Sequence, residues 1–347
     1  MTKHLISLAA VLALSAPAIA QDEPEGAPSP NQIVADAQAG EWVAIAGEDL
    51  LVMTLAPAAD GSVRQVVMQL MPAPFSAGWT GNIRKLARAQ WYDGISINRV
   101  QDNYVVQWGD PNVDNPEATG PEKALPADLA TMTDGDYIIA GEAIGLSTLA
   151  ADTQRDLALD TDGMAGTDPT TGIILANGLV DSYAQLSLFH EGWPLASDMG
   201  GDNEGEAHVW PIHCYGMIGV GRGYSPDTGT GAELYTVIGH APRHLDRNIA
   251  LVGRIVEGIE HLSSLPRGTG DLGFYEDPAQ RVPILSIRVA SDLAPGERPQ
   301  FSYLDTDSES FARYADARAN RRDPFFIVPA GGADICNIPV PVKRLSE

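Results

Sequence analysis

The sequence predicts a mainly β protein built on a closed antiparallel barrel. Short segments of alternating apolar and polar residues recur along the chain and are separated by turns. Glycine and proline supply 35 and 25 of the 347 residues, which favours a loop-rich β fold over a helical bundle. Many short strands with only two helices among them indicate a closed barrel rather than an alternating βαβ sheet.

Composition and charge exclude several classes of protein. The chain is 44% hydrophobic and 20% charged, which is typical of a soluble globular protein and excludes a disordered or fibrous one. It has 22 Lys plus Arg against 46 Asp plus Glu, a formal net charge of −24. Such a chain cannot easily supply the basic face that a phosphate backbone needs, so no nucleic acid is expected as a partner.

Residues 1–20 have the pattern of a cleaved secretory signal peptide. A basic start at Lys3 precedes an apolar stretch from Leu5 to Leu14, and Ala18-Ile19-Ala20 provides an A-x-A cleavage site. The stretch is too short for a membrane anchor, and no later segment is long and apolar enough to span a bilayer. We therefore expect a periplasmic protein with no membrane span in the mature chain.

The predicted elements follow in order along the chain. A leader at 21–48 contains an acidic, proline-rich stretch at 21–30 and a short helix over 31–39 that ends before Gly40. Asp60-Gly61 joins two alternating strands into a hairpin, and apolar residues at helical spacing predict an amphipathic helix over 76–91. A second short helix is expected over 257–264. The strands expected in the barrel are 51–55, 66–70, 95–100, 104–108, 215–220, 233–238, 249–255 and 283–289.

The barrel segments predict one domain over 49–292 that is interrupted by an insertion at about 112–212. The insertion has poor periodicity, but its aromatic residues Tyr183, Phe189, Trp193 and Trp210 predict an ordered lobe against the barrel, because disordered segments are poor in such residues. A C-terminal extension covers 293–347. Within it, a capping box formed by Thr306 and Glu309 predicts a helix that runs to about residue 321.

Two cysteines, Cys214 and Cys336, are expected to form a disulfide. An exported protein resides where thiols become oxidised, and these are the chain's two cysteines. Two separate buried thiols remain the alternative, because the sequence does not give the distance between them.

Three segments carry motifs in a defined order. They read I-N-R-V-Q-D-N-Y-V-V-Q-W-G-D-P over 97–111, T-G-T-G-A-E-L-Y-T-V-I over 228–238, and L-D-R-N-I-A-L-V-G-R-I-V-E-G-I over 245–259. With these segments the chain resembles the cyclophilins, whose motifs F-H-R-I-I…F-M-x-Q-G-G-D, N-G-S-Q-F-F-I, L-D and V-F-G-x-V occur in the same order and spacing. The resemblance covers about residues 50–289, apart from the insertion. It implies an eight-stranded barrel with two helices, no cofactor, and proline-containing polypeptides as partners.

The resemblance also implies roles for individual residues. Arg99 matches the family's active-site arginine, and Gln107 matches the glutamine that supports it. Several positions depart from the family pattern: Glu233 replaces a glutamine, His244 a tryptophan, and Ile249 a histidine of the proline pocket. Tyr235 stands where the family has a pocket phenylalanine, Gly221 where it has an alanine, and Trp108 where it has the first glycine of its Gly-Gly-Asp turn. The expected substrate-binding residues are Tyr104, Val105, Gly221, Arg222, Glu233, Tyr235, Leu245 and Ile249.

These residues suit the isomerisation of an X-Pro bond. Amide resonance opposes rotation with a barrier of about 18–20 kcal/mol, and no covalent step is needed to lower it. An arginine aimed at the amide nitrogen helps only when the nitrogen lone pair localises, so it stabilises the transition state more than the ground state. We therefore expect a peptidyl-prolyl cis-trans isomerase that acts on exported polypeptides. The alternative is a proline-peptide-binding chaperone or docking module with weak turnover.

Other candidate chemistry is weaker. His240 and His244 have a spacing that could place both on one helix face, but Pro242 lies between them, so no metal site is expected. The acidic run at 160–163 does not fit a calcium-binding loop, because position 158 is alanine and position 169 is proline. No nucleophile elbow, phosphate-binding loop or Cys-x-x-Cys motif is present in the sequence.

Overall fold

The structure of the protein, a computed structural model, describes residues 26–113, 118, 120–146, 181–198 and 206–345. The predicted signal peptide at 1–20 and the acidic run at 160–163 lie outside the described residues. No helix in the described part of the chain is long and apolar enough to cross a membrane.

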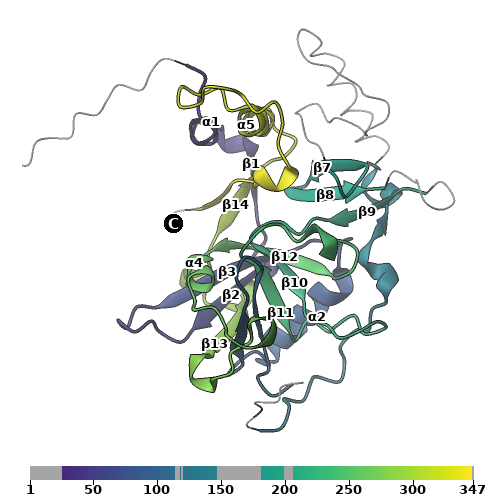
Figure 1. The fold of residues 1–347 in the computed structure, drawn as a ribbon, viewed down its shortest axis with the longest axis vertical. Coiled ribbons are helices and arrows are strands. Elements are labelled where there is room, and N and C mark those ends of the chain that lie inside the picture. The colour runs from purple at the N-terminus through teal and green to yellow at the C-terminus, as the bar shows by residue number, and fades with distance from the viewer. Residues whose placement is uncertain (1–25, 114–117, 119, 147–180, 199–205, 346–347) are drawn as a thin grey trace, which may run out of the picture.

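Eight strands close into an antiparallel barrel in the order β10-β11-β5-β4-β13-β2-β3-β12, which confirms the predicted fold class (Figure 1). The two predicted helices of the barrel are also present, as α2 (Ala77–Arg88) and α4 (Glu260–Ser263). The barrel strands are β2 (Leu50–Leu55), β3 (Arg64–Leu70), β4 (Ser96–Val100), β5 (Val105–Gly109), β10 (Met217–Val220), β11 (Leu234–Val237), β12 (Leu251–Glu257) and β13 (Val282–Val289).

Alternation along the strands separates the inside of the barrel from its outside. On β5 and β11 the inward side chains Val106, Trp108 and Leu234 belong to the barrel core. Their neighbours Val105 and Tyr235 belong to a separate apolar cluster. Successive side chains of a strand point to opposite faces, so this second cluster lies on the outer face of the barrel wall.

Much of the leader, the later part of the insertion and the C-terminal extension form a second lobe around a core of its own, whereas Met132 and Tyr137 of the insertion pack in the barrel core. Residues from the predicted leader, insertion and C-terminal extension all contribute to this core, which also includes Met71 and Leu251 of the barrel region. In Figure 1 helices α1 and α5 lie together at the end of the molecule farthest from β13. The lobe contains the helices α1 (Pro30–Asp36) and α5 (Glu309–Asn320), a sheet of β6 (Ile139–Ala140), β9 (His208–Pro211), β8 (Trp193–Ser197) and β7 (Leu186–His190), and a sheet of β1 (Trp42–Ala44), β14 (Phe301–Leu304) and β15 (Val342–Arg344).

The aromatic residues of the insertion differ in burial. Trp193 and Trp210 are among the largest fully buried side chains, and Phe189 packs against the core of the second lobe. Tyr183 is 56% exposed instead, although its ring lies against the Arg243 guanidinium at 5.1 Å. The described strands of the insertion are therefore an ordered part of the second lobe.

Helix ends differ from those predicted. Helix α5 is capped by Ser308, whose hydroxyl accepts from the Phe311 backbone NH, and not by Thr306. Thr306 accepts a hydrogen bond from the Gly192 NH of the β7–β8 turn. Thr306 therefore joins two segments of the lobe that are far apart in sequence, which helix-cap spacing alone could not reveal.

Cys214 and Cys336 form a disulfide with a Cα–Cα distance of 5.1 Å and a sequence separation of 122. Cys214 lies just before β10 of the barrel, and Cys336 lies in a short 3₁₀ turn over Ile335–Asn337. The bond therefore ties the C-terminal segment of the second lobe to the barrel.

A buried arginine also joins the two parts. Arg254 of β12 lies with its Cζ 4.5 Å from the Trp193 ring centroid and 5.8 Å from that of Tyr303. It donates to Gln69 Oε1 at 2.8 Å and to the Gly192 carbonyl at 2.7 Å. Burial lowers the pKa of Arg254 to about 10.

We expect Arg254→Met to lower the free energy of unfolding by about 1 kcal/mol, because the Gln69 and Gly192 oxygens lose a buried donor while the apolar stem is kept. Urea denaturation measures the effect. Arg298→Met, at an exposed position, is the control and should change little. An Arg254→Met protein as stable as the parent would show that the bridge does not hold the lobe to the barrel.

Candidate active site

Three of the predicted site residues lie in one row across neighbouring strands, and Gly219 on a fourth strand ends the row. Arg99 on β4 pairs with Gln107 on β5, Gln107 pairs with Tyr235 on β11, and Tyr235 pairs with Gly219 on β10. Directly opposite residues in antiparallel strands share a face of the sheet. The site is therefore built on the outer wall of the barrel, and the interior is filled by core side chains.

Arg99 is held from several directions. Its Nη1 donates to Gln107 Oε1 at 2.8 Å, its Nε donates to the Leu272 carbonyl at 2.7 Å, and its Nη2 donates to Gln101 Oε1. The strands shift register between Ile97 and Arg99, which is the kind of irregularity that re-aims a side chain. These contacts fix the plane of the guanidinium, as an arginine that acts through directed N–H groups requires.

Two aromatic rings flank the same guanidinium. The Arg99 Cζ lies 5.6 Å from the Tyr104 ring centroid and 5.5 Å from that of Phe274. Burial lowers the pKa of Arg99, while the charges of Tyr104 and Glu233 act in the opposite direction. The guanidinium still carries its charge at neutral pH, so a partly desolvated cation faces the substrate side.

An apolar cup lies beside Arg99. Its centre is Val105, Tyr235 and Val237, which are at most 5% exposed. Five of the predicted substrate-binding residues belong to it: Tyr104, Val105, Tyr235, Leu245 and Ile249. His244 is not part of this cluster but stacks on Tyr104 with ring centroids 6.3 Å apart. We call this cluster the apolar cup; its partly buried members Tyr104, Leu245 and Ile249 are the ones that leave apolar surface accessible.

The three other predicted binding residues, Gly221, Arg222 and Glu233, lie beside the row, two or three residues along the chain from Gly219 of β10 or Tyr235 of β11. Glu233 accepts from Gln107 Nε2, so the glutamine joins the arginine to a carboxylate. Arg222 turns its guanidinium to the Asn248 carbonyl, with Nε at 3.0 Å and Nη2 at 2.7 Å. Its side chain thus braces the loop that carries Ile249, while the Gly221–Arg222 backbone borders the site.

Gly221 makes room for the Glu233 side chain. A β-carbon at position 221 would lie 2.7 Å from Glu233 Cγ, and one at Gly109 would lie 3.1 Å from the same atom. Two glycines therefore accommodate this acidic residue beside Gln107. The structure gives a steric reason for glycine at the position where the family carries alanine.

We expect Gly221→Ala to lower kcat/KM about threefold to fivefold, because the displaced Glu233 breaks its hydrogen bond to Gln107. Steady-state isomerisation assays measure this change. Gly81→Ala on α2, where an added β-carbon meets nothing within 4 Å, is the matched control. In a Glu233→Ala background the same substitution should have little further effect, and a full additional loss there would contradict the steric explanation.

Sequence patterns missed three residues around Arg99. Gln101 is on the same side of its strand two residues later, so the period of two could have found it. Leu272 and Phe274 come from a loop more than 170 residues away, and Phe274 forms an isolated β-bridge with Arg99. No local signal links that loop to the arginine.

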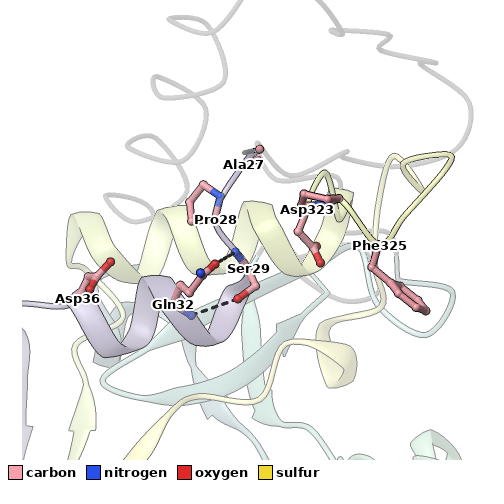
Figure 2. A pocket seen from close by; sticks show the side chains of 9 residues that line it. Ala27, Pro28, Ser29, Gln32, Asp36, Asp323 and Phe325 are labelled. Atoms are coloured by element: carbon pink, nitrogen blue, oxygen red, sulfur yellow. Dashed lines mark hydrogen bonds between the residues drawn. The ribbon is translucent and has the colours of Figure 1, made fainter. Parts of the chain in front are cut away.

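A cavity of about 510 Å³ lies elsewhere, between the start of α1 and the segment after α5 (Figure 2). Its Ser29 and Gln32 hydrogen-bond each other as the cap of α1. None of its lining residues belongs to the predicted site. Among the described residues, no group of three or more His, Cys, Asp or Glu is placed to hold a metal ion.

A closed barrel with an arginine, a glutamine and an apolar cluster on its outer wall is the arrangement expected of an isomerase that needs no covalent step. The chain belongs to the cyclophilins, because the family described as "Cyclophilin type peptidyl-prolyl cis-trans isomerase/CLD" matches residues 77–289, more than half of its length. Its activity is peptidyl-prolyl cis-trans isomerisation, and it binds proline-containing peptides.

The fold is also similar to the crystal structure of cyclophilin AquaCyp293 from Hirschia baltica. The TM-score is 0.60 at 20% sequence identity, and the match covers 90% of this chain and 96% of that chain. At this identity the similarity concerns the fold. A comparison with curated proteins finds no match.

Proposed function

We propose that this isomerase acts on X-Pro bonds of exported polypeptides in the periplasm, with Arg99 as its catalytic residue. The observation that carries the proposal is the Arg99 guanidinium, oriented by Gln107 beside the apolar cup. As in other cyclophilins, a folding assistant of this kind needs no cofactor. Proline-containing segments of partly folded proteins are its substrates.

The proposed mechanism uses the cup and the arginine together. The cup buries the proline ring and holds it still, while the carbonyl side of the X-Pro bond rotates. As the amide twists, the nitrogen lone pair leaves conjugation, and an Arg99 N–H donates to it. Because this hydrogen bond forms only in the twisted state, Arg99 accelerates rotation without tightening ground-state binding.

Gln107 and Glu233 have a supporting role in this proposal. Gln107 accepts from Arg99 Nη1 and donates to Glu233, so it fixes the Arg99 guanidinium relative to the Glu233 carboxylate. The carboxylate of Glu233 also partly balances the cost of desolvating the guanidinium. Ile249 contributes apolar surface to the cup where the family carries a histidine.

Export is supported by the signal-peptide pattern of residues 1–20 and by the disulfide, because disulfides persist in oxidising compartments. Cell fractionation tests the location. We expect the protein in the periplasmic fraction with an amino terminus at Gln21. A cytosolic protein that retains residues 1–20 would contradict this part of the proposal.

A protease-coupled assay tests the activity of the mature chain on X-Pro peptides. Chymotrypsin cleaves the reporter peptide only when its X-Pro bond is trans, so isomerisation limits the slow phase. We expect this phase to accelerate in proportion to enzyme concentration. Binding of the peptide without acceleration would favour a docking module instead.

A further inference from the structure

A chain of buried polar side chains runs from the apolar cup to the second lobe. Tyr235 Oη lies 3.0 Å from His213 Nε2, and His213 Nδ1 lies 2.9 Å from Asp246 Oδ1. Asp246 Oδ2 accepts from Arg243 Nε at 2.6 Å, and Arg243 Nη2 donates to Asp181 Oδ2 at 2.7 Å. The side chains of the last four residues are at most 4% exposed.

With His213 neutral, the donors and acceptors along this series of side chains have one consistent assignment. A carboxylate accepts only, so His213 Nδ1 carries the proton and donates to Asp246. His213 Nε2 is then the acceptor for the Tyr235 hydroxyl. Burial raises the pKa of Tyr235 well above its ordinary value, so this hydroxyl keeps the proton that it donates.

Asp181, the last side chain in this hydrogen-bonded series, lies in the insertion. Asp181 Oδ2 also accepts from the Ser187 hydroxyl at 2.5 Å, and Asp181 Oδ1 accepts from the Tyr183 NH at 2.8 Å. Burial alone would raise the pKa of Asp181, but the hydrogen bonds from Arg243 and Ser187 lower it below its ordinary value. Ser187 is on β7, so the second lobe holds this carboxylate in place.

The site is built to accept a hydroxyl on Tyr235. A β-carbon at Gly219, its cross-strand partner, would lie only 2.2 Å from Tyr235 Oη. The ring also stacks on His213 with an interplanar angle of 13° and centroids 6.3 Å apart. The room left by Gly219, the hydrogen bond to His213 and the stacking on His213 all favour tyrosine at position 235, where the family carries phenylalanine.

Of the five hydrogen-bonded side chains, Tyr235 is the one that belongs to the cup. The ring can turn or shift only if its hydroxyl leaves His213, and an unpartnered buried hydroxyl is costly. His213 is in turn held by Asp246, which accepts both its Nδ1 proton and its backbone NH at 3.0 Å. The position of the Tyr235 ring in the cup is therefore coupled to the Asp181 carboxylate in the second lobe.

We propose that His213, Asp246 and Arg243 are positioning residues for Tyr235, and that the second lobe acts through Asp181 to set the fit of the apolar cup to the proline ring. This inference rests on the proposed binding role of Tyr235. It gives the insertion a function in substrate affinity, although Asp181 is not itself part of the cup.

The test combines Asp181→Asn with Tyr235→Phe. Asparagine has one acceptor oxygen in place of two, so it cannot satisfy Arg243, Ser187 and the Tyr183 NH together. We expect Asp181→Asn to weaken the binding of a proline-containing tetrapeptide about threefold to tenfold, measured by NMR titration, with kcat unchanged. Tyr235→Phe should weaken binding to a similar extent.

The double variant separates positioning from general stability. Because Tyr235→Phe already disconnects the ring, adding Asp181→Asn should weaken binding no further. Additive losses of affinity would overturn the proposal, as would an Asp181→Asn protein that binds like the parent. Asp198→Asn is the matched control, since this carboxylate of the same lobe pairs with His208 and not with the chain to Tyr235.

Two further measurements keep the outcome interpretable. Ser187→Ala removes one donor to Asp181 and should weaken binding in the same direction if Asp181→Asn fails to fold. Unchanged affinity in a folded Ser187→Ala protein would then count against the proposal. Arg99→Ala tests the proposed function separately: its loss of turnover together with normal Asp181→Asn binding would reject only the positioning role.

Discussion

Replacement of Arg99 by alanine is expected to lower kcat/KM at least about tenfold, which corresponds to about 1.4 kcal/mol of transition-state stabilisation. The reason is that the arginine acts on a lone pair that localises only as the amide twists. The substitution leaves the apolar cup in place, so peptide affinity should change much less than turnover. Protease-coupled kinetics and NMR titration of the same peptide measure the two quantities separately.

Lysine should not rescue the alanine variant. An ammonium group lacks the planar fork with which Arg99 contacts Gln107, Gln101 and the Leu272 carbonyl together. Arg267→Ala is the matched control, because Arg267 is exposed near the site and pairs with Asp102. Full turnover in a folded Arg99→Ala protein would reject the catalytic assignment.

Loss of the disulfide is expected to have the largest effect on stability. The bond closes a loop with a sequence separation of 122, so its removal should lower the free energy of unfolding by about 3–5 kcal/mol in the chain-entropy picture. It also joins the C-terminal segment of the second lobe to the start of β10. Urea denaturation of the oxidised protein and of Cys214→Ser/Cys336→Ser measures the difference.

The second lobe should respond first. Trp193 and Trp210 are buried in its core and Trp79 and Trp108 in the barrel core, so the near-UV circular dichroism that Trp193→Phe/Trp210→Phe removes is the part that reports the packing of the lobe. We expect this signal to weaken at lower urea concentration in the double serine variant, while the barrel unfolds later. Titration of two free thiols in native, unreduced protein would contradict the disulfide itself.

The barrel could be predicted from the sequence because alternation along a strand is a local pattern, and the candidate site residues could be predicted because their motifs resemble those of the cyclophilins. Alternating apolar residues mark each barrel strand, and one-residue alternation also decides that Val105 and Tyr235 lie on the face opposite Val106 and Leu234. The order of motifs then assigned Arg99 and Gln107 to neighbouring strands. Their pairing and hydrogen bond agree with that assignment.

Helix termini were less predictable. The spacing of Thr306 and Glu309 fits a capping box, yet Ser308 caps α5 and Thr306 accepts from the Gly192 NH instead. Both residues have side chains that can cap a helix, and sequence spacing alone does not choose between them.

Only the tertiary structure decided which distant segments meet. The leader, the insertion and the C-terminal extension have no periodic relation to one another, yet they share one core with the end of the barrel. In the same way, no local pattern predicts that the Phe274 ring lies against Arg99. Nor does one predict that Asp181 accepts from Arg243 and so joins the hydrogen-bonded side chains that end at Tyr235. The sequence by itself determined the strands, because backbone alternation is local, and its resemblance to the cyclophilin motifs singled out Arg99 and Gln107 as candidates for the site. The second lobe and its link to the cup depend on long-range packing, where burial and hydrogen-bond satisfaction select among many sequence-compatible arrangements.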